Sequence, residues 1–185
     1  MQWNIPGTVL MANDQETEHM EETFRAMFLG GGMVLSQVAA VTGLEPYTIQ
    51  NWVKRGFLSN PVGKRYTLEQ LCRIISINML KSALPLEDIC GLLRYVNGQL
   101  NDNSDDLIDD ATLYFLFLRL AAQHRRMNLR EGRDTAIAAA LEGYEEPIPG
   151  AKGRVEKVLR VMLTAWAAAQ LKQAAQKMVK ELKEE

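Results

Sequence analysis

The stretch LSQVAAVTGLEPYTIQNWVKRGFL, residues 35–58, predicts two short helices that meet at a turn. Apolar side chains repeat at helical spacing on both sides of Gly43, a residue that tolerates the positive φ of a tight turn. Ala39 is small, so the two helices can cross closely there. Pro46 falls in the first turn of the second helix, where its missing N–H costs no hydrogen bond. We therefore expect a helix-turn-helix, with Ser36 as the N-cap of its first helix.

The second helix separates apolar from polar side chains. Ile49, Trp52 and Val53 form the side that we expect to face a core. On the outward side, Gln and Asn are suited to an adenine edge, and Lys and Arg to phosphate or guanine. The candidate DNA-contacting residues of this helix are Tyr47, Thr48, Gln50, Asn51, Lys54 and Arg55.

A short basic segment follows the two helices. The sequence FLSNPVGKRYT, residues 57–67, places apolar flanks around turn residues and predicts a small β-ribbon. Lys64, Arg65 and Tyr66 complete the candidate DNA-contacting set. Residues 36–66 carry four basic side chains against one acid, whereas the whole chain has a formal charge of −2. Basic charge is therefore concentrated around the helix-turn-helix.

Helical patterns dominate the other segments, and no strand is expected outside the ribbon. Thr67 and Gln70 are spaced as a capping box, and the acid-rich residues 101–110 read as a linker that caps the next helix. A calcium loop is disfavoured because its glycine and closing Glu are missing. The expected helices run from residue 14 to the glycines at 30–32, and over 67–83, 85–96, 107–129, 135–141 and 155–182.

Several classes of function lack their sequence signals. Cys72 and Cys90 stand among aliphatic residues and read as buried free thiols, and His19 and His124 are isolated, so we expect no metal site. No nucleophile with an adjacent base, phosphate loop or carboxylate pair is evident, so we expect neither an enzyme nor a cofactor. Without a signal peptide or an apolar run of ~20 residues, the expected location is the cytoplasm.

The run from Leu35 to Leu93, about a third of the chain, resembles the DNA-binding region of the MerR family of bacterial transcription regulators. The stretch is also similar to an uncharacterised bacterial family of MerR-like proteins whose function is unassigned. The matching segments are SQVAAVTGLEPYTIQNW, KRGFL, NPVGKRYT and LEQLCRIISINMLKSALPLEDICGLL.

The resemblance implies a mainly α-helical fold with a winged helix-turn-helix at 33–98. Residues 1–32 would form an N-terminal helical extension and residues 99–185 a C-terminal dimerisation or effector region. The second helix would enter the major groove of double-stranded DNA, and the ribbon would be a wing on the phosphates. Thr48, Gln50, Lys54 and Arg65 fall at family contact positions.

Two readings of function stay open. Clustered cations favour a regulator that binds an operator as a homodimer. The chain departs from the family at Gln50, where Arg is common, and at Asn51, where an aromatic residue is common. These departures, with the low net charge, favour a helical protein-interaction module that keeps the winged scaffold without operator binding.

The C-terminal region raises two further expectations. The last helix carries an apolar stripe through Val155, Trp166 and Leu182 that suits a dimer interface, although it equally suits the subunit's own core. A small-molecule effector is also open. The aromatic residues that would line its pocket, or else form plain core, are Tyr114, Phe115, Phe117 and Trp166.

Overall fold

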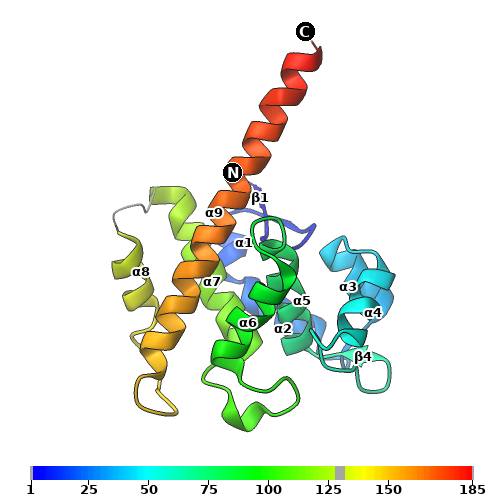
Figure 1. Ribbon diagram of the computed structural model, residues 1–185, viewed down its shortest axis with the longest axis vertical. Coiled ribbons are helices and arrows are strands. Elements are labelled where there is room, and N and C mark those ends of the chain that lie inside the picture. The colour runs from blue at the N-terminus through cyan, green and yellow to red at the C-terminus, as the bar shows by residue number, and fades with distance from the viewer. Residues whose placement is uncertain (1, 128–131, 185) are drawn as a thin grey trace.

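Helices form most of the molecule, as the sequence predicts (Figure 1). A computed structural model describes residues 2–127 and 132–184. Long helices α5 and α7 pack together at the centre, and α6, α8 and α9 pack around them. The helices are α1 Asp14–Glu18, α2 Met20–Met27, α3 Leu35–Thr42, α4 Pro46–Lys54, α5 Leu68–Leu80, α6 Leu86–Asn97, α7 Asp110–Met127, α8 Arg133–Ala140 and α9 Ala151–Glu184, with a 3-10 turn at Asn103–Asp105.

One hydrophobic core runs through the described chain from Trp3 to Trp166. The three segments expected from the sequence therefore share their core. The helix predicted over 107–129 corresponds to α7, and its predicted end at Leu129 lies outside the described residues. Among the residues that are described, no helix is long and apolar enough to cross a membrane.

Two small antiparallel ribbons accompany the helices. Strand β1, Trp3–Asn4, pairs with β2, Met11–Ala12, and β3, Met33–Val34, pairs with β4, Arg65–Tyr66. The expectation of a single strand-forming place was wrong, because two-residue strands are too short to show an alternating pattern. Strand β3 precedes α3 and strand β4 follows α4, so the second ribbon joins the two ends of the segment that contains both helices.

Two short helices, α3 and α4, meet at a turn where the sequence predicts them. Gly43 has φ of 68° and its N–H donates to the Ala39 carbonyl at 2.8 Å, which ends α3. The start of α3 differs from expectation. The helix begins at Leu35, and the N–H of Val34 donates to Oε1 of Gln37 at 3.0 Å. Ser36 therefore lies inside the first turn and is not the N-cap.

Side-chain caps fix the ends of the two central helices. Thr67 Oγ1 accepts from the Gln70 N–H at 3.2 Å, and Gln70 Oε1 accepts from the Thr67 N–H at 2.9 Å, which confirms the capping box. Asp109 caps α7, since Oδ1 accepts from the Thr112 N–H at 2.8 Å. The acid-rich linker therefore caps the next helix, as expected.

The loop of the β1–β2 hairpin, which the sequence did not predict, contacts both α3 and α5. Gly7, in its loop, has φ of 78°, and an added Cβ would lie 2.3 Å from the carbonyl oxygen of Ile75. Nδ2 of Asn78, on α5, donates to the carbonyls of Gly7 and Thr42, both at 2.9 Å. One amide group thus holds the hairpin, α3 and α5 together.

A buried ion pair joins α5 to α7. Nη1 of Arg73 lies 3.2 Å from Oδ2 of Asp110, and Nε donates to the Phe57 carbonyl at 3.0 Å. Arg73 is only 6% exposed. Burial raises the pKa of Asp110, and the guanidinium of Arg73 opposes that shift. Removing one partner would leave the other charge buried and uncompensated.

We expect Arg73→Met to lower the free energy of unfolding by about 3–5 kcal/mol, because Asp110 is then buried without its counter-charge. Adding Asp110→Asn should recover part of that loss by removing the charge. Urea unfolding followed by circular dichroism measures both values. A loss below about 1 kcal/mol for the single variant would contradict the role given to this pair.

Asp106, just before α7, has a pKa raised to about 6 by burial and by the neighbouring carboxylates of Asp110, Asp105 and Asp109. A carboxyl that holds its proton more tightly in the folded chain stabilises the fold while it is protonated. That contribution is complete below its ordinary pKa of 3.8 and is lost as the pH rises through about 6.

Asp106→Asn should therefore stabilise the protein near neutral pH and change little in acid. We expect a gain of about 1 kcal/mol at neutral pH, after allowing for solvent screening. Urea titrations on the two sides of the transition test this. Asp102→Asn is the matched control, because hydrogen bonds from Ser104 lower the pKa of Asp102 and give the opposite sign. A gain that is the same at both pH values would refute the assignment.

Candidate nucleic-acid interface

Helix α4 presents a polar side to solvent. Ile49 and Trp52 are buried and fix the rotation of the helix. Four of the six candidates on α4 and at its end are exposed and make no side-chain hydrogen bond or ion pair with the described residues, while Thr48 is half-buried. Those four are Tyr47, Gln50, Asn51 and Lys54. Tyr47, near the N-terminal end, is 71% exposed.

Arg55, directly after α4, is engaged within the chain. Its Nη2 lies 2.7 Å from Oε1 of Glu87 on α6, and its Cζ lies 4.5 Å from the ring centroid of Phe57. The backbone turns sharply here at Gly56, where the Phe57 N–H donates to the Trp52 carbonyl at 2.9 Å. Arg55 therefore has less freedom to meet DNA than the sequence alone indicates.

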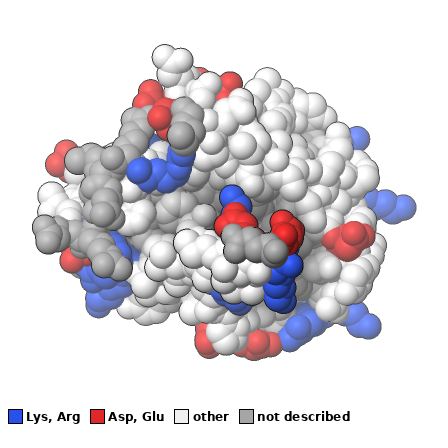
Figure 2. Space-filling model, turned by 90° about the horizontal axis from the view of Figure 1, so that it is seen from above, with Lys and Arg blue, Asp and Glu red and all other residues white. Residues whose placement is uncertain are grey.

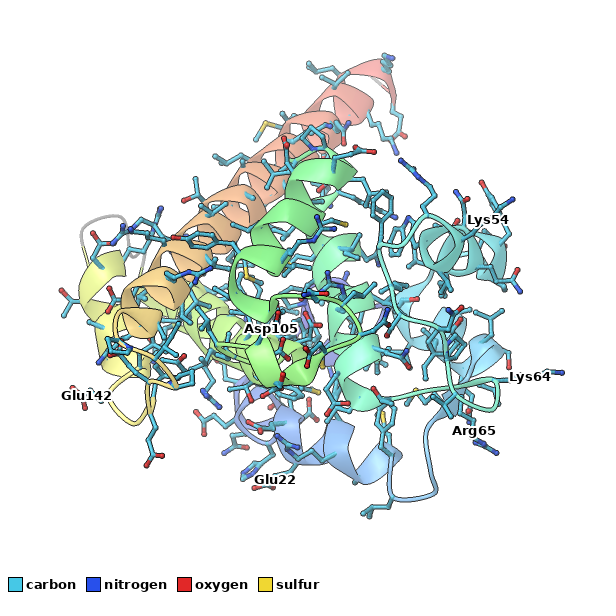
Figure 3. The ribbon with its side chains drawn as sticks, turned by 60° about the horizontal axis from the view of Figure 1, so that its bottom comes forward. Glu22, Lys54, Lys64, Arg65, Asp105 and Glu142 are labelled. Atoms are coloured by element: carbon cyan, nitrogen blue, oxygen red, sulfur yellow. The ribbon has the colours of Figure 1, made fainter. Side chains whose placement is uncertain are left out.

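The segment before β4, which is the candidate wing, ends in a tight two-residue turn. Gly63 and Lys64 have φ of 56° and 62°, and the Arg65 N–H donates to the Val62 carbonyl at 3.0 Å. Positive φ at both central residues is the requirement of a type I′ hairpin turn. Lys64 is consequently held at the tip, with its ammonium pointing into solvent (Figure 3).

Arg65 and Tyr66 lie on opposite faces of β4. Arg65 is exposed and its Nη1 donates to the Gly32 carbonyl at 3.0 Å. Tyr66 is 3% exposed and packs in the core, where burial raises the pKa of its phenol. The inclusion of Tyr66 among DNA-contacting residues is therefore wrong. Adjacent residues of a strand point to opposite faces, so Arg65 and Tyr66 cannot both face a ligand.

The structure brings the free cations together at one end. Lys54, Lys64 and Arg65 lie on the same side of the molecule, at the end formed by α4 and the wing, and away from α9 (Figure 3). The acids nearest in sequence are Glu45, at the N-cap of α4, and Glu69, in the first turn of α5. Seen from above, the molecule shows side chains of both signs of charge scattered among uncharged ones (Figure 2).

The sequence did not predict the residues that bind the arginine side chains of this surface. Glu87 pairs with Arg55 across 32 positions of the chain, and the Gly32 carbonyl accepts from Arg65 across 33. Val62, beside the wing tip, is 81% exposed. No local sequence pattern marks Glu87 or Gly32, because their contacts with Arg55 and Arg65 are long-range. The strand pairing of 33–34 with 65–66 is the signal that would have located them.

Of the four aromatic residues that could line an effector pocket or form plain core, three lie in the core and one, Trp166, lines a groove described below. Tyr114, Phe115 and Phe117 are buried in the core, where Phe24 packs edge-on against Phe115 with ring centroids 5.8 Å apart. These residues are therefore plain core, which was the other interpretation. Cys72 and Cys90 are free and buried, as expected. Within 2–127 and 132–184, no three His, Cys, Asp or Glu side chains converge as a metal site would require.

Comparison with known proteins gives a family but no activity. A stretch of 84 residues, 43% of this chain, is 33% identical to the uncharacterized protein YkrK of Bacillus subtilis (strain 168). The match spans 36% of the length of YkrK. No solved structure matches the chain significantly. The family model described as "Domain of unknown function (DUF1836)" matches residues 4–117, and the chain therefore belongs to that family.

Proposed function

We propose that this protein is a sequence-specific DNA-binding regulator of transcription that acts as a homodimer. Helix α4 would lie in the major groove, and the wing would contact the phosphate backbone. The observation that carries the proposal is the shared placement of the polar side of α4 and the cationic wing at one end of the molecule (Figure 3). Resemblance to MerR-like regulators adds support, and the family itself adds none, because its function is unknown.

The two parts of this surface suit different tasks. Gln50 and Asn51 carry amides that can bond an adenine edge, and Tyr47 offers an apolar ring to a thymine methyl group. Lys64 and Arg65 supply point charges for phosphates, which position a protein without reading sequence. Lys54 stands at the end of α4, with the amides, but carries a positive charge, as the two wing residues do.

The free cations set the expected salt dependence. Lys54, Lys64 and Arg65 are exposed and form no ion pair with the described residues, whereas Arg55 pairs with Glu87. A dimer would thus neutralise about six phosphates, which gives a slope of log affinity against log salt near −5. Measured by fluorescence anisotropy on duplexes selected from a random pool, this slope tests the proposal. Failure to bind any duplex, or binding with no salt slope, favours the protein-interaction module.

Charge and amide variants should behave differently. Lys64→Asn, which tolerates the left-handed backbone, and Arg65→Ala should weaken binding to all sequences alike and make the salt slope shallower by about 2 per dimer. Gln50→Ala and Asn51→Ala should cost about 1–3 kcal/mol on the selected site and little on other DNA. Lys157→Ala, exposed on α9, is the control. Identical behaviour of the two pairs would overturn the roles of wing and reading helix.

The free part of α9 supports the dimer. Residues 151–169 bury one stripe in the subunit's core, but residues 170–184 are exposed throughout and project beyond the other elements (Figure 1). Isolated helices of about 12–15 residues are marginal in water. Leu171, Ala175, Met178 and Leu182 are spaced by four, three and four residues, the repeat of a coiled-coil seam.

We expect Leu171→Glu and Leu182→Glu, made together, to shift the protein from dimer to monomer. A charge on the seam would be buried without a partner in the dimer. Light scattering after size-exclusion chromatography measures the mass, over a range of concentrations. Gln176→Glu, on the other side of the same helix, adds a charge off the seam and should leave the dimer intact. A monomeric wild-type protein would refute this part of the proposal.

A further inference from the structure

An open groove of about 980 Å³ lies where α9 leaves the body of the molecule. Three segments far apart in the sequence line it, namely the β1–β2 hairpin, the end of α7, and α8 with α9. None of its residues belongs to the candidate DNA interface. The lining residues used below are Trp3, Met11, Arg125, Arg133, Trp166 and Leu171.

The charged side chains among the described lining residues of the groove are basic. Two arginines and no acid stand among the described lining residues. Nη1 of Arg133 donates to Oγ1 of Thr164 at 2.8 Å, while its Nε is buried and has no hydrogen-bond partner among the described residues. A buried donor without a partner is costly, so this guanidinium has bonding capacity to offer a ligand.

One of the two arginines is paired within the chain, whereas no ion pair of Arg133 is found among the described residues. Arg125 stacks on the ring of Trp3, with Cζ 4.5 Å from the centroid, and is 3.7 Å from Oδ1 of Asp14. His124 also lines the groove. Desolvation and the charge of Arg133 lower the pKa of its imidazole, so it is neutral near pH 7.

The remaining lining mixes apolar side chains with the polar side chains of Asn4, Thr164, Gln170 and Gln173. The rings of Trp3 and Trp166 meet edge-on with centroids 6.4 Å apart, and the side chains of Met11 and Leu171 are exposed at the rim. Sites for small organic molecules combine such apolar walls with a few polar groups that fix orientation. An inorganic anion would leave these walls unused.

We propose that this groove binds a small organic carboxylate with an apolar body. The carboxylate lies between Arg125 and Arg133, and the apolar body lies against the edges of Trp3 and Trp166. Guanidinium and carboxylate match in shape as well as in charge, because two parallel hydrogen bonds can form. This proposal is independent of DNA binding, so either can fail without the other.

The indole N–H signals of the three tryptophans provide the test. We would titrate the full-length, ¹⁵N-labelled protein with sodium benzoate against matched sodium chloride, and assign each signal with a Trp→Phe variant. The signals of Trp3 and Trp166 should shift saturably, with a dissociation constant of about 1 mM for so small a probe. Trp52, in the core beneath α4, is the internal reference.

Two neutral or truncated probes separate the contributions. Benzamide lacks the charge and acetate lacks the apolar body, so each should bind at least about tenfold more weakly, the equivalent of 1.4 kcal/mol. Equal shifts from benzamide would show a merely apolar surface, and equal shifts from acetate an adventitious ion. Either result would overturn the proposal, as would the absence of saturable shifts with benzoate.

Variants locate the site. Arg133→Gln and Arg125→Gln should each raise the dissociation constant for benzoate about tenfold. Arg119→Gln, on the same α7 but paired with Glu21 outside the groove, should leave it unchanged. Because the groove meets the α9 stripe at Leu171, each variant is first checked for an unchanged oligomeric state. Equal loss in the Arg119 control would place binding elsewhere and refute the assignment.

Discussion

The fixed position of the helix-turn-helix depends on two polar side chains of α5 that bind backbone carbonyls of other segments. Arg73 donates to Phe57, at the end of the helix-turn-helix, and pairs with Asp110 on α7. One turn further on, Asn78 donates to Gly7 and Thr42. The three carbonyls lie in a loop or at the end of a helix, where regular backbone pairing stops. A buried carbonyl without a donor would cost free energy. These two side chains therefore hold the β1–β2 loop, the end of α3 and the segment after α4 against α5.

This fastening makes the hairpin a physical link between two distant surfaces. Its strands line the groove through Trp3 and Met11, and its loop contacts α3, where the Val9 N–H donates to the Val41 carbonyl at 3.0 Å. A side chain added at Gly43 would lie 2.6 Å from Val9. The hairpin therefore contacts both the groove and the turn between α3 and α4.

Local signals explain what the sequence reveals. The capping box at Thr67, the cap at Asp109 and the glycine turn at Gly43 each depend on residues within four positions, so they were found. The N-terminal hairpin and the β3–β4 pairing depend on contacts between two-residue strands, which leave no periodic pattern. Tyr66 illustrates the consequence. Its burial follows from a strand pairing across more than 30 positions, and composition near the wing gives no hint of it.

The same distinction changes how basic residues are read. In the sequence, Arg55 and Arg73 have the same side chain as Arg65, yet the structure commits the first to Glu87 and the second to Asp110. The proposed interface is left with fewer free cations than the sequence suggests, and we therefore expect a correspondingly modest affinity for phosphate. Neutral groups on α4 must then supply a larger share of binding. Specific contact by Gln50, Asn51 and the exposed ring of Tyr47 becomes a requirement of the proposed function.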